Sequence, residues 1–258
     1  MSKKWLKVAL MVTAIATGTS IQVDAETVLY VPQDDRPVSL QYTVDTAKAA
    51  GMTVLTPPQN LISGKTYKGQ ADQIWNWVEQ NAGRADVMVL STDTLIYGGL
   101  VDSRKHNLPL STLENRLKRI EALKANHKNI RIYGFGTVMR SPRASGGGTE
   151  PSYYADYGPT IFQIAALQDK LDAGTLTQAE TQKLMSLQAS VPVEYLQDWF
   201  SRRQKNMQVN KDLIDEARNG VFAYFALGHD DTSQLSQSAL EGRYLNQYSK
   251  GIPRTQYG

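Results

Sequence analysis

Two pairs of adjacent aspartates are the residues of this chain best suited to acid–base chemistry. Asp34 and Asp35 begin the segment Asp-Asp-Arg-Pro, and Asp230 and Asp231 directly follow His229. Like charges held together in a cleft raise the pKa of one member, which places a proton donor beside a carboxylate acceptor. The pairs therefore predict a site for acid–base catalysis, with these four aspartates as candidate catalytic residues.

The same aspartates have a structural alternative. Aspartate is a favoured helix N-cap, and Pro37 and Gln234 stand where the first residues of a helix are common. Neighbours in a turn point in different directions, so one member of each pair can cap a helix while the other faces a ligand. The sequence leaves both roles open.

A fifth candidate catalytic carboxylate, Asp93, precedes a glycine turn. Tyr97, Gly98 and Gly99 follow it, and Arg104 comes five residues later. Glycine lets the backbone approach a ligand closely, and arginine binds anions through paired hydrogen bonds. We predict that these four residues after Asp93 bind substrate. The alternative is a plain glycine turn with Arg104 on the surface.

Two further arginines belong to the predicted substrate-binding set, Arg36 and Arg140. Arginines beside aspartates also form structural ion pairs, and this role is favoured for Arg36. Arg140 and its neighbour Arg143 have the same alternative.

The sequence predicts neither a bound metal nor a cofactor. His229, which we include in the substrate-binding set, is the only histidine at a predicted strand end, because His106 and His127 lie in polar segments. An oxygen-coordinated ion on the aspartates stays open as an alternative. The glycines at 146–148 lack the lysine of a phosphate-binding loop, and those at 134–136 lack the third glycine of a dinucleotide fingerprint.

The candidate residues share one position relative to the predicted strands. Each cluster comes shortly after an apolar run, at residues 27–31, 87–90, 130–135 and 221–226. These runs alternate with amphipathic segments, which is typical of a parallel sheet with flanking helices. Residues beyond the carboxyl ends of parallel strands converge on one crevice. We predict an α/β fold, either an open Rossmann-like sheet or an incomplete barrel, with all clusters in one site.

The alternation of strands and helices is interrupted between residues 140 and 219. A polar loop over residues 140–159 is too long for a simple connection, so we expect it to border the site. It contains three tyrosines able to stack on sugar rings: Tyr153, Tyr154 and Tyr157. The following segment, to residue 219, predicts an inserted helical layer. Residues Ser111 with Glu114, and Thr177 with Glu180, have the spacing of capping boxes.

The first 25 residues have the pattern of an export signal. Basic residues precede an apolar stretch over residues 8–21, and Ala25 suits a cleavage site. We predict a signal peptide over 1–25, a single mature α/β domain over 26–258, and a secreted or extracytoplasmic bacterial protein. An uncleaved anchor is the alternative. No later segment is apolar enough to span a membrane, so we expect no stable span after cleavage.

Composition narrows the class of function. The chain has 258 residues, a formal charge of +3 and no cysteine, which excludes disulfides and cysteine nucleophiles. No run of adjacent basic residues exceeds two, so a nucleic-acid partner is not predicted. The chain ends after a predicted helix, where a further strand is expected, and this predicts truncation at the carboxyl end.

Three segments resemble the DUF4127 family of bacterial proteins. They are Tyr-Val-Pro-Gln-Asp-Asp-Arg-Pro-Val at 30–38, the segment from Ser91 to Arg104, and Gly-His-Asp-Asp-Thr-Ser-Gln at 228–234. The resemblance covers most of the mature chain and implies the amino-terminal part of a longer protein. The family name records an unknown function, so the resemblance supports the site without naming its reaction.

The sequence predicts a carbohydrate-active hydrolase that acts on a glycan or another small molecule. Paired carboxylates, tyrosines, export and the lack of cofactor motifs are all consistent with glycoside hydrolysis. Two alternatives remain: a noncatalytic carbohydrate- or solute-binding protein, and a metal-dependent phosphoester hydrolase.

Overall fold

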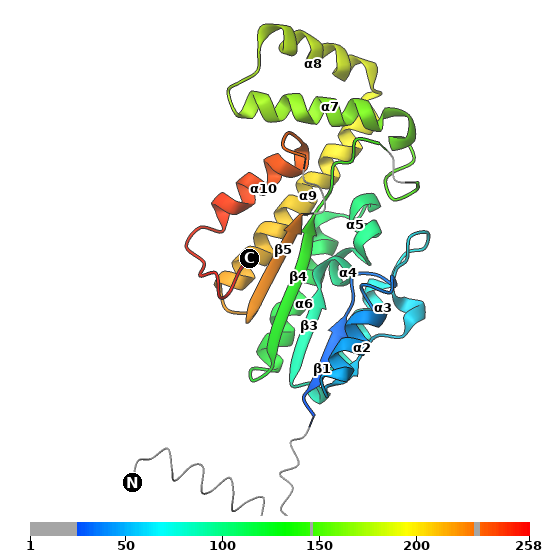
Figure 1. Cartoon of the computed structure of the whole chain (residues 1–258), viewed down its shortest axis with the longest axis vertical. Coiled ribbons are helices and arrows are strands. Elements are labelled where there is room, and N and C mark those ends of the chain that lie inside the picture. Colours follow the sequence, from blue (N-terminus) through cyan, green and yellow to red (C-terminus); the bar gives the residue numbers. More distant parts are fainter. Residues whose placement is uncertain (1–24, 145–146, 230–232) are drawn as a thin grey trace, which may run out of the picture.

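The computed structural model describes residues 25–144, 147–229 and 233–258 (Figure 1). The predicted signal peptide, apart from Ala25, lies outside the described residues, and so do Asp230 and Asp231. Within the described ranges, no helix is long and apolar enough to cross a membrane.

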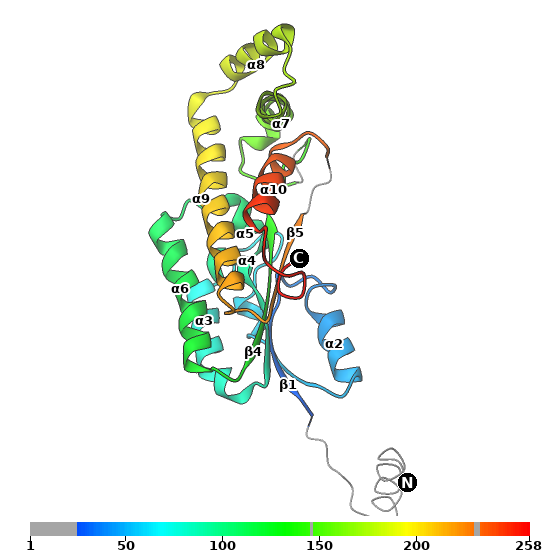
Figure 2. The same ribbon diagram turned by 90° about the vertical axis from the view of Figure 1, so that its left-hand side faces the viewer.

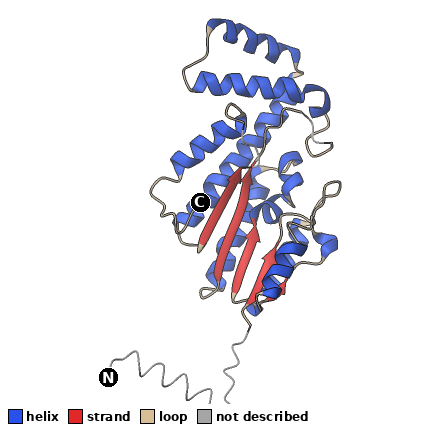
Figure 3. Ribbon diagram, viewed as in Figure 1, coloured by secondary structure: helices blue, strands red, loops and turns tan. Residues whose placement is uncertain are grey.

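Five parallel strands form one open sheet in the order β2-β1-β3-β4-β5. Their bounds are β1 Thr27–Val31, β2 Thr53–Leu55, β3 Val87–Ser91, β4 Arg131–Val138 and β5 Tyr224–His229. Every pairing between neighbouring strands is parallel, and the arrows in Figure 3 run in the same direction. The predicted α/β fold is confirmed, and of its two forms the structure has the open sheet.

The register of the sheet aligns the strand ends that matter for the site. Val31 of β1 pairs with Leu90 of β3, and Ser91 of β3 pairs with Phe135 of β4. Strands β1 and β3 therefore end nearly level, and β4 continues three residues further, to Val138. The segments that follow β1, β3 and β4 begin close together.

Helices flank the sheet and extend beyond it. Their bounds are α2 Gln41–Ala49, α3 Ala71–Asn81, α4 Thr92–Tyr97, α5 Leu100–Lys105, α6 Leu110–Asn126, α7 Tyr154–Asp172, α8 Gln178–Ser190, α9 Val193–Arg218 and α10 Gln237–Tyr248, with short 3-10 turns at Gln59–Leu61 and Ala82–Arg84. Helices α3, α6 and α9 cover one face of the sheet, while α2 lies on the other (Figure 2).

The main core lies between the sheet and the three helices on one face. Leu29, Met88 and Ile132 from the strands are fully buried, and so are Trp75 of α3 and Leu113 of α6. The apolar residues of α3 and α6 recur at helical spacing, which presents one buried stripe to the strands. This packing holds the site-bearing turns at the far end of the strands.

A helical layer stands beyond the carboxyl ends of the strands (Figure 1). Helices α7 and α8 and the first part of α9 have their own core, which includes Tyr154, Ile161 and Trp199. These helices lie between β4 and β5 in the chain, where the sequence predicts the inserted layer.

One of the two capping boxes predicted from the sequence is present in the structure and the other is not. The capping box of Thr177 and Glu180 is confirmed at α8. The one predicted for Ser111 and Glu114 is wrong, because α6 begins at Leu110, and its N-cap residue is Pro109, which makes no side-chain capping hydrogen bond.

Candidate functional site

A polar pocket of about 300 Å³ lies beyond the carboxyl ends of the central strands. The residues that line it are Asp34, Arg36, Lys65, Leu100, Val101, Arg104, Arg140 and Thr149. The order of the sheet reverses at β1, because β2 lies on one side of it and β3 on the other. Doubly wound sheets of this order bind ligands at that reversal. We call this cavity the switch-point pocket.

Asp34 is the carboxylate that the turn after β1 presents to the switch-point pocket. Arg36 Nε donates a 2.7 Å hydrogen bond to Asp34 Oδ2, and the Arg36 amide donates to Oδ1 at 3.2 Å. The Asp34 residue is 5% exposed, whereas half of the Arg36 side chain is exposed. The ion pair predicted for Arg36 is confirmed, and it fixes the orientation of the Asp34 carboxylate.

Asp35 points away from Asp34. Its carboxylate accepts a hydrogen bond from the Tyr67 hydroxyl and lines a separate groove beside α2. Neither aspartate caps α2, because that helix begins at Gln41 with Leu40 as its N-cap. The structure therefore does not bring the Asp34–Asp35 pair together in one pocket, since neighbouring side chains in the turn diverge.

Asp93 is buried near the carboxyl ends of the central strands. It lies in the first turn of α4, which the Ser91 side chain caps, and only 2% of it is exposed. Gln33 Nε2 and Thr137 Oγ1 donate to Asp93 Oδ2 at 2.8 and 2.9 Å. Burial raises its pKa to about 6, although these bonds and the positive charge of Arg104 act in the opposite direction.

These contacts give Asp93 a structural position, and the catalytic role predicted for it stays a prediction. Its hydrogen bonds connect the segments at the ends of β1, β3 and β4, and it is not among the residues that line the switch-point pocket. The sequence does not predict that the Asp93 side chain faces inward. Helix α4 has six residues and all of them are buried, so no hydrophobic pattern marks an inner face.

The glycine pair after Asp93 serves close packing within the protein. Gly98 has a φ of +111° and ends α4, and Gly99 starts α5. A Cβ atom built on Gly99 would lie 1.7 Å from Ser63 Oγ. Tyr97 is buried and stacks on His106, with ring centroids 5.0 Å apart. None of the predicted binders Tyr97, Gly98 and Gly99 lines the switch-point pocket, because this turn packs against the loop around Ser63.

We expect Gly99→Ala to lower the free energy of unfolding by about 2 kcal/mol, because the new methyl group overlaps Ser63. Urea denaturation measures the change. Gly83→Ala is the matched control, since a Cβ there meets nothing within 4 Å. Equal stability of the two variants would show that the contact between Gly99 and Ser63 is not tight.

Arg104 and Arg140 bring guanidinium groups to the switch-point pocket from two elements. Arg104 lies on α5 and is 4% exposed. Arg140 follows β4 and donates to Glu150 Oε1 from Nε at 2.8 Å and to Thr149 Oγ1 from Nη2 at 2.7 Å. Of the predicted binders, these two and Arg36 line the pocket.

The loop after β4 borders the switch-point pocket, as the sequence predicts. It contributes Arg140 and Thr149, while Arg143 lies over the ring of Phe162, 5.3 Å from its centroid, outside the pocket. Arg203 of α9 holds the start of this loop by donating to the carbonyls of Met139 and Arg140 at 2.6 and 2.9 Å.

His229 lies apart from the switch-point pocket. It is the last residue of β5, and its ring packs against Gly242 of α10. Burial lowers its pKa, and the Glu241 carboxylate opposes that shift. The sequence places His229 just beyond the end of a strand, but β5 ends three residues later than predicted and includes His229 at the edge of the sheet.

The three tyrosines of the predicted loop pack within the helical layer. The loop is shorter than the predicted 140–159, because α7 begins at Tyr154 and includes Tyr157. Tyr154 is fully buried, Tyr153 stacks on Tyr195 with centroids 4.7 Å apart, and Tyr157 contacts the same ring. None of them lines the switch-point pocket, so the predicted stacking on sugar rings has no support there.

Sequence reasoning missed two polar residues of the switch-point pocket, Lys65 and Thr149. Lys65 lies in the loop before α3, and no strand or motif marks it. Thr149 lies in the polar loop already expected at the site, so its position offered a partial signal. In the described part of the chain, no three His, Asp or Glu side chains group closely enough to hold a metal ion.

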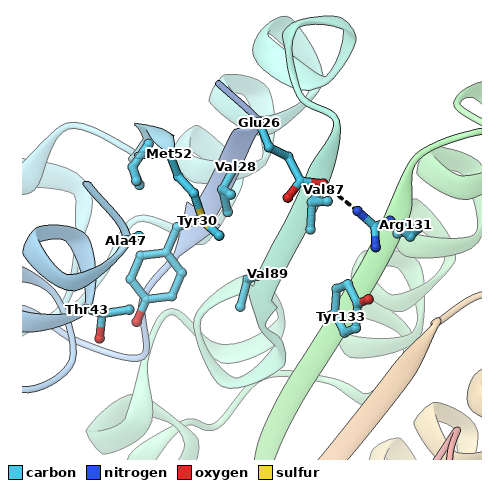
Figure 4. A pocket seen from close by; sticks show the side chains of 11 residues that line it. Glu26, Val28, Tyr30, Thr43, Ala47, Met52, Val87, Val89, Arg131 and Tyr133 are labelled. Atoms are coloured by element: carbon cyan, nitrogen blue, oxygen red, sulfur yellow. Dashed lines mark hydrogen bonds and ion pairs between the residues drawn. The ribbon is translucent and has the colours of Figure 1, made fainter. Parts of the chain in front are cut away.

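A second pocket, of about 260 Å³, lies on the sheet face beside α2 (Figure 4). Val28, Tyr30, Val89 and Tyr133 face it, and an ion pair between Glu26 and Arg131 closes one end. Its lining is mostly apolar, so it offers less acid–base chemistry than the switch-point pocket.

The fold and the site define an α/β protein with an open parallel sheet and a polar, arginine-lined pocket at the reversal of strand order. The chain belongs to the DUF4127 family, described as proteins of unknown function, whose family model matches residues 28–256. Neither the curated proteins nor the solved structures include a match to the chain.

Proposed function

We propose that this protein is an exported hydrolase that acts on a carbohydrate in the switch-point pocket, with Asp34 as its acid–base residue. The observation that carries the proposal is the position of Asp34, a carboxylate oriented by Arg36 in a cavity where such sheets bind ligands. The volume of the pocket suits a small ligand. The export signal predicted from the sequence supports a substrate outside the cytoplasm.

A carboxylate that is fixed in orientation can accept a proton from water or attack a sugar carbon directly. Glycoside hydrolysis generally uses two carboxyl groups, one as acid and one as base or nucleophile. Asp34 can take one of these roles, because Arg36 fixes its direction toward the cavity. Asp230 and Asp231, the second predicted pair, lie outside the described residues.

One observation favours a second function, noncatalytic binding of a carbohydrate or solute. Asp34 is the single carboxylate among the described residues that line the switch-point pocket, whereas hydrolysis generally requires two. Binding without turnover is therefore the alternative outcome of the functional test.

The test is turnover of a panel of aryl glycosides and aryl phosphates by the mature protein, from about pH 4 to about pH 8, with and without chelator. We expect cleavage of at least one glycoside in the presence of chelator. Asp34→Asn should lower kcat by about a hundredfold or more, and Asp45→Asn, which changes an exposed aspartate of α2, should leave it unchanged.

Each remaining result has a defined meaning. Full activity in a folded Asp34→Asn variant would overturn the catalytic role of Asp34. Ligand binding without turnover of any substrate would favour the binding protein, and phosphate ester cleavage that is lost with chelator would favour a metal-dependent phosphoesterase.

A further inference from the structure

Cationic side chains outnumber carboxylates in the described lining of the switch-point pocket, and two of them are ion-paired, Arg36 with Asp34 and Arg140 with Glu150. Asp34 is its single carboxylate, and four of its side chains are cationic: Arg36, Lys65, Arg104 and Arg140. Gathering like charges around a cavity raises the local potential and attracts ions of opposite sign. The pocket thus has the electrostatic character of a site for an anion.

The four cations converge from different parts of the chain. Arg36 lies in the turn after β1, Lys65 in the loop before α3, Arg104 on α5, and Arg140 after β4. Such convergence at the reversal of strand order cannot arise from a single charged helix face. It is a property of the tertiary fold and of the cavity that the fold creates.

The cations differ in how firmly they are held. Arg140 is fixed by Glu150, whose side chain is 1% exposed, and by Thr149. Lys65 is exposed and forms no ion pair with a described residue. A guanidinium group held in place binds a planar or tetrahedral anion through paired hydrogen bonds with less loss of entropy, and a nearby lysine adds a mobile point charge.

We infer that the switch-point pocket binds the acidic group of its ligand, so that the carbohydrate is an acidic sugar bearing a carboxylate, sulfate or phosphate group. The sugar part of this inference rests on the proposed function. The preference for an anion rests on the lining of the pocket alone. The volume of about 300 Å³ is at the lower end for small-ligand sites, which suits one sugar residue.

The test is isothermal titration calorimetry with glucuronate, glucose 6-sulfate, glucose 6-phosphate and glucose. We expect at least one acidic sugar to bind about tenfold or more tightly than glucose. That advantage should shrink when salt is raised from about 0.05 M to about 0.3 M, because salt screens the attraction. The acidic sugar that binds most tightly identifies the acidic group.

Two lysine variants separate a local contact from a general charge effect. Lys65→Gln should weaken the binding of the acidic sugar about threefold to fivefold, which is the effect expected for one exposed charge. It should leave the affinity for glucose unchanged. Lys183→Gln makes the same change on α8, outside the pocket, and should change neither affinity. Neither lysine has a described ion-pair partner to leave unpaired, so both variants should fold.

The outcomes distinguish this inference from the proposed function. Tight binding of an acidic sugar without any glycoside cleavage supports the anion site and counts against the hydrolase. Glucose binding as tightly as every acidic sugar, equal effects of the two lysine variants, or no binding of any acidic sugar at about 10 mM would overturn the anion site, even if neutral glycosides are cleaved.

Discussion

Replacing Arg203 with methionine is expected to lower the free energy of unfolding by about 3 to 5 kcal/mol. Arg203 is 1% exposed and donates to both carboxylate oxygens of Glu241 at 2.8 and 2.7 Å. It also donates to the carbonyls of Met139 and Arg140. Its removal leaves a buried carboxylate without its charge partner, which is among the most costly single changes in a protein interior. Urea denaturation followed by circular dichroism measures the loss.

Two further variants identify the cause of that loss. Arg131→Met breaks an exposed ion pair with Glu26 and should change stability by less than about 1 kcal/mol. The double variant Arg203→Met, Glu241→Met removes both buried charges, and the Ser238 hydroxyl still donates to the Met139 carbonyl. We expect it to recover more than half of the loss. A double variant as unstable as the single one would contradict the role of the unpaired carboxylate.

The position of Arg203 also connects the helical layer to the site. It projects from α9, and its bonds fix the backbone from which Arg140 enters the switch-point pocket. Ser238 of α10 donates to the same stretch of chain. Helices inserted between β4 and β5 therefore help to set the geometry of a pocket formed at β1, β3 and β4.

The sequence was sufficient to predict the parallel sheet and that some of the strand-end residues meet at one end of it. Apolar runs alternate with amphipathic segments, and this periodicity depends only on burial in a layered fold. Residues shortly after the strands meet at one end because parallel strands share a direction. For that reason the sequence predicts one cavity for Asp34, Arg36, Arg104 and Arg140, and all four line the switch-point pocket.

The direction of individual side chains could not be predicted. Asp34 and Asp35 are adjacent, yet they face different cavities, because the turn after β1 has no period that relates its side chains. Asp93 turns inward because α4 begins immediately after β3, and a helix this short leaves no hydrophobic pattern. Lys65 reaches the pocket from a loop whose path depends on tertiary packing.

The sequence also does not distinguish an aspartate that meets substrate from one that holds the fold together. Asp34 and Asp93 both follow central strands and both are buried, but Asp34 lines the switch-point pocket and Asp93 does not. Asp93 accepts hydrogen bonds from Gln33 and Thr137, groups on the strands to either side of β3 or just beyond them. A raised pKa is common to catalytic carboxyls and to buried structural ones, so it does not decide between these roles.

Stability is expected to depend on pH through Asp93. Burial raises its pKa in the folded protein to about 6, from an ordinary value of 3.8. The folded state then binds a proton more tightly than the unfolded chain. The contribution of Asp93 to the free energy of unfolding is therefore full below about pH 4, falls as the pH rises toward 6, and is lost above that. The total change is about 3 kcal/mol.

Asp93→Asn should remove this dependence, because asparagine carries no charge and its carbonyl oxygen can accept from Gln33 and Thr137. The measurement is the difference in unfolding free energy between the wild-type protein and the variant from about pH 4 to about pH 8, which cancels the other titrating groups. We expect the difference to shift by about 3 kcal/mol in favour of the variant as pH rises.

Thr137→Val removes one donor to the carboxylate, which raises the pKa of Asp93 further and moves the transition to higher pH. A difference that is constant with pH would mean that Asp93 is ionised in the folded protein throughout this range, and that the protein interior stabilises its charge as well as water does.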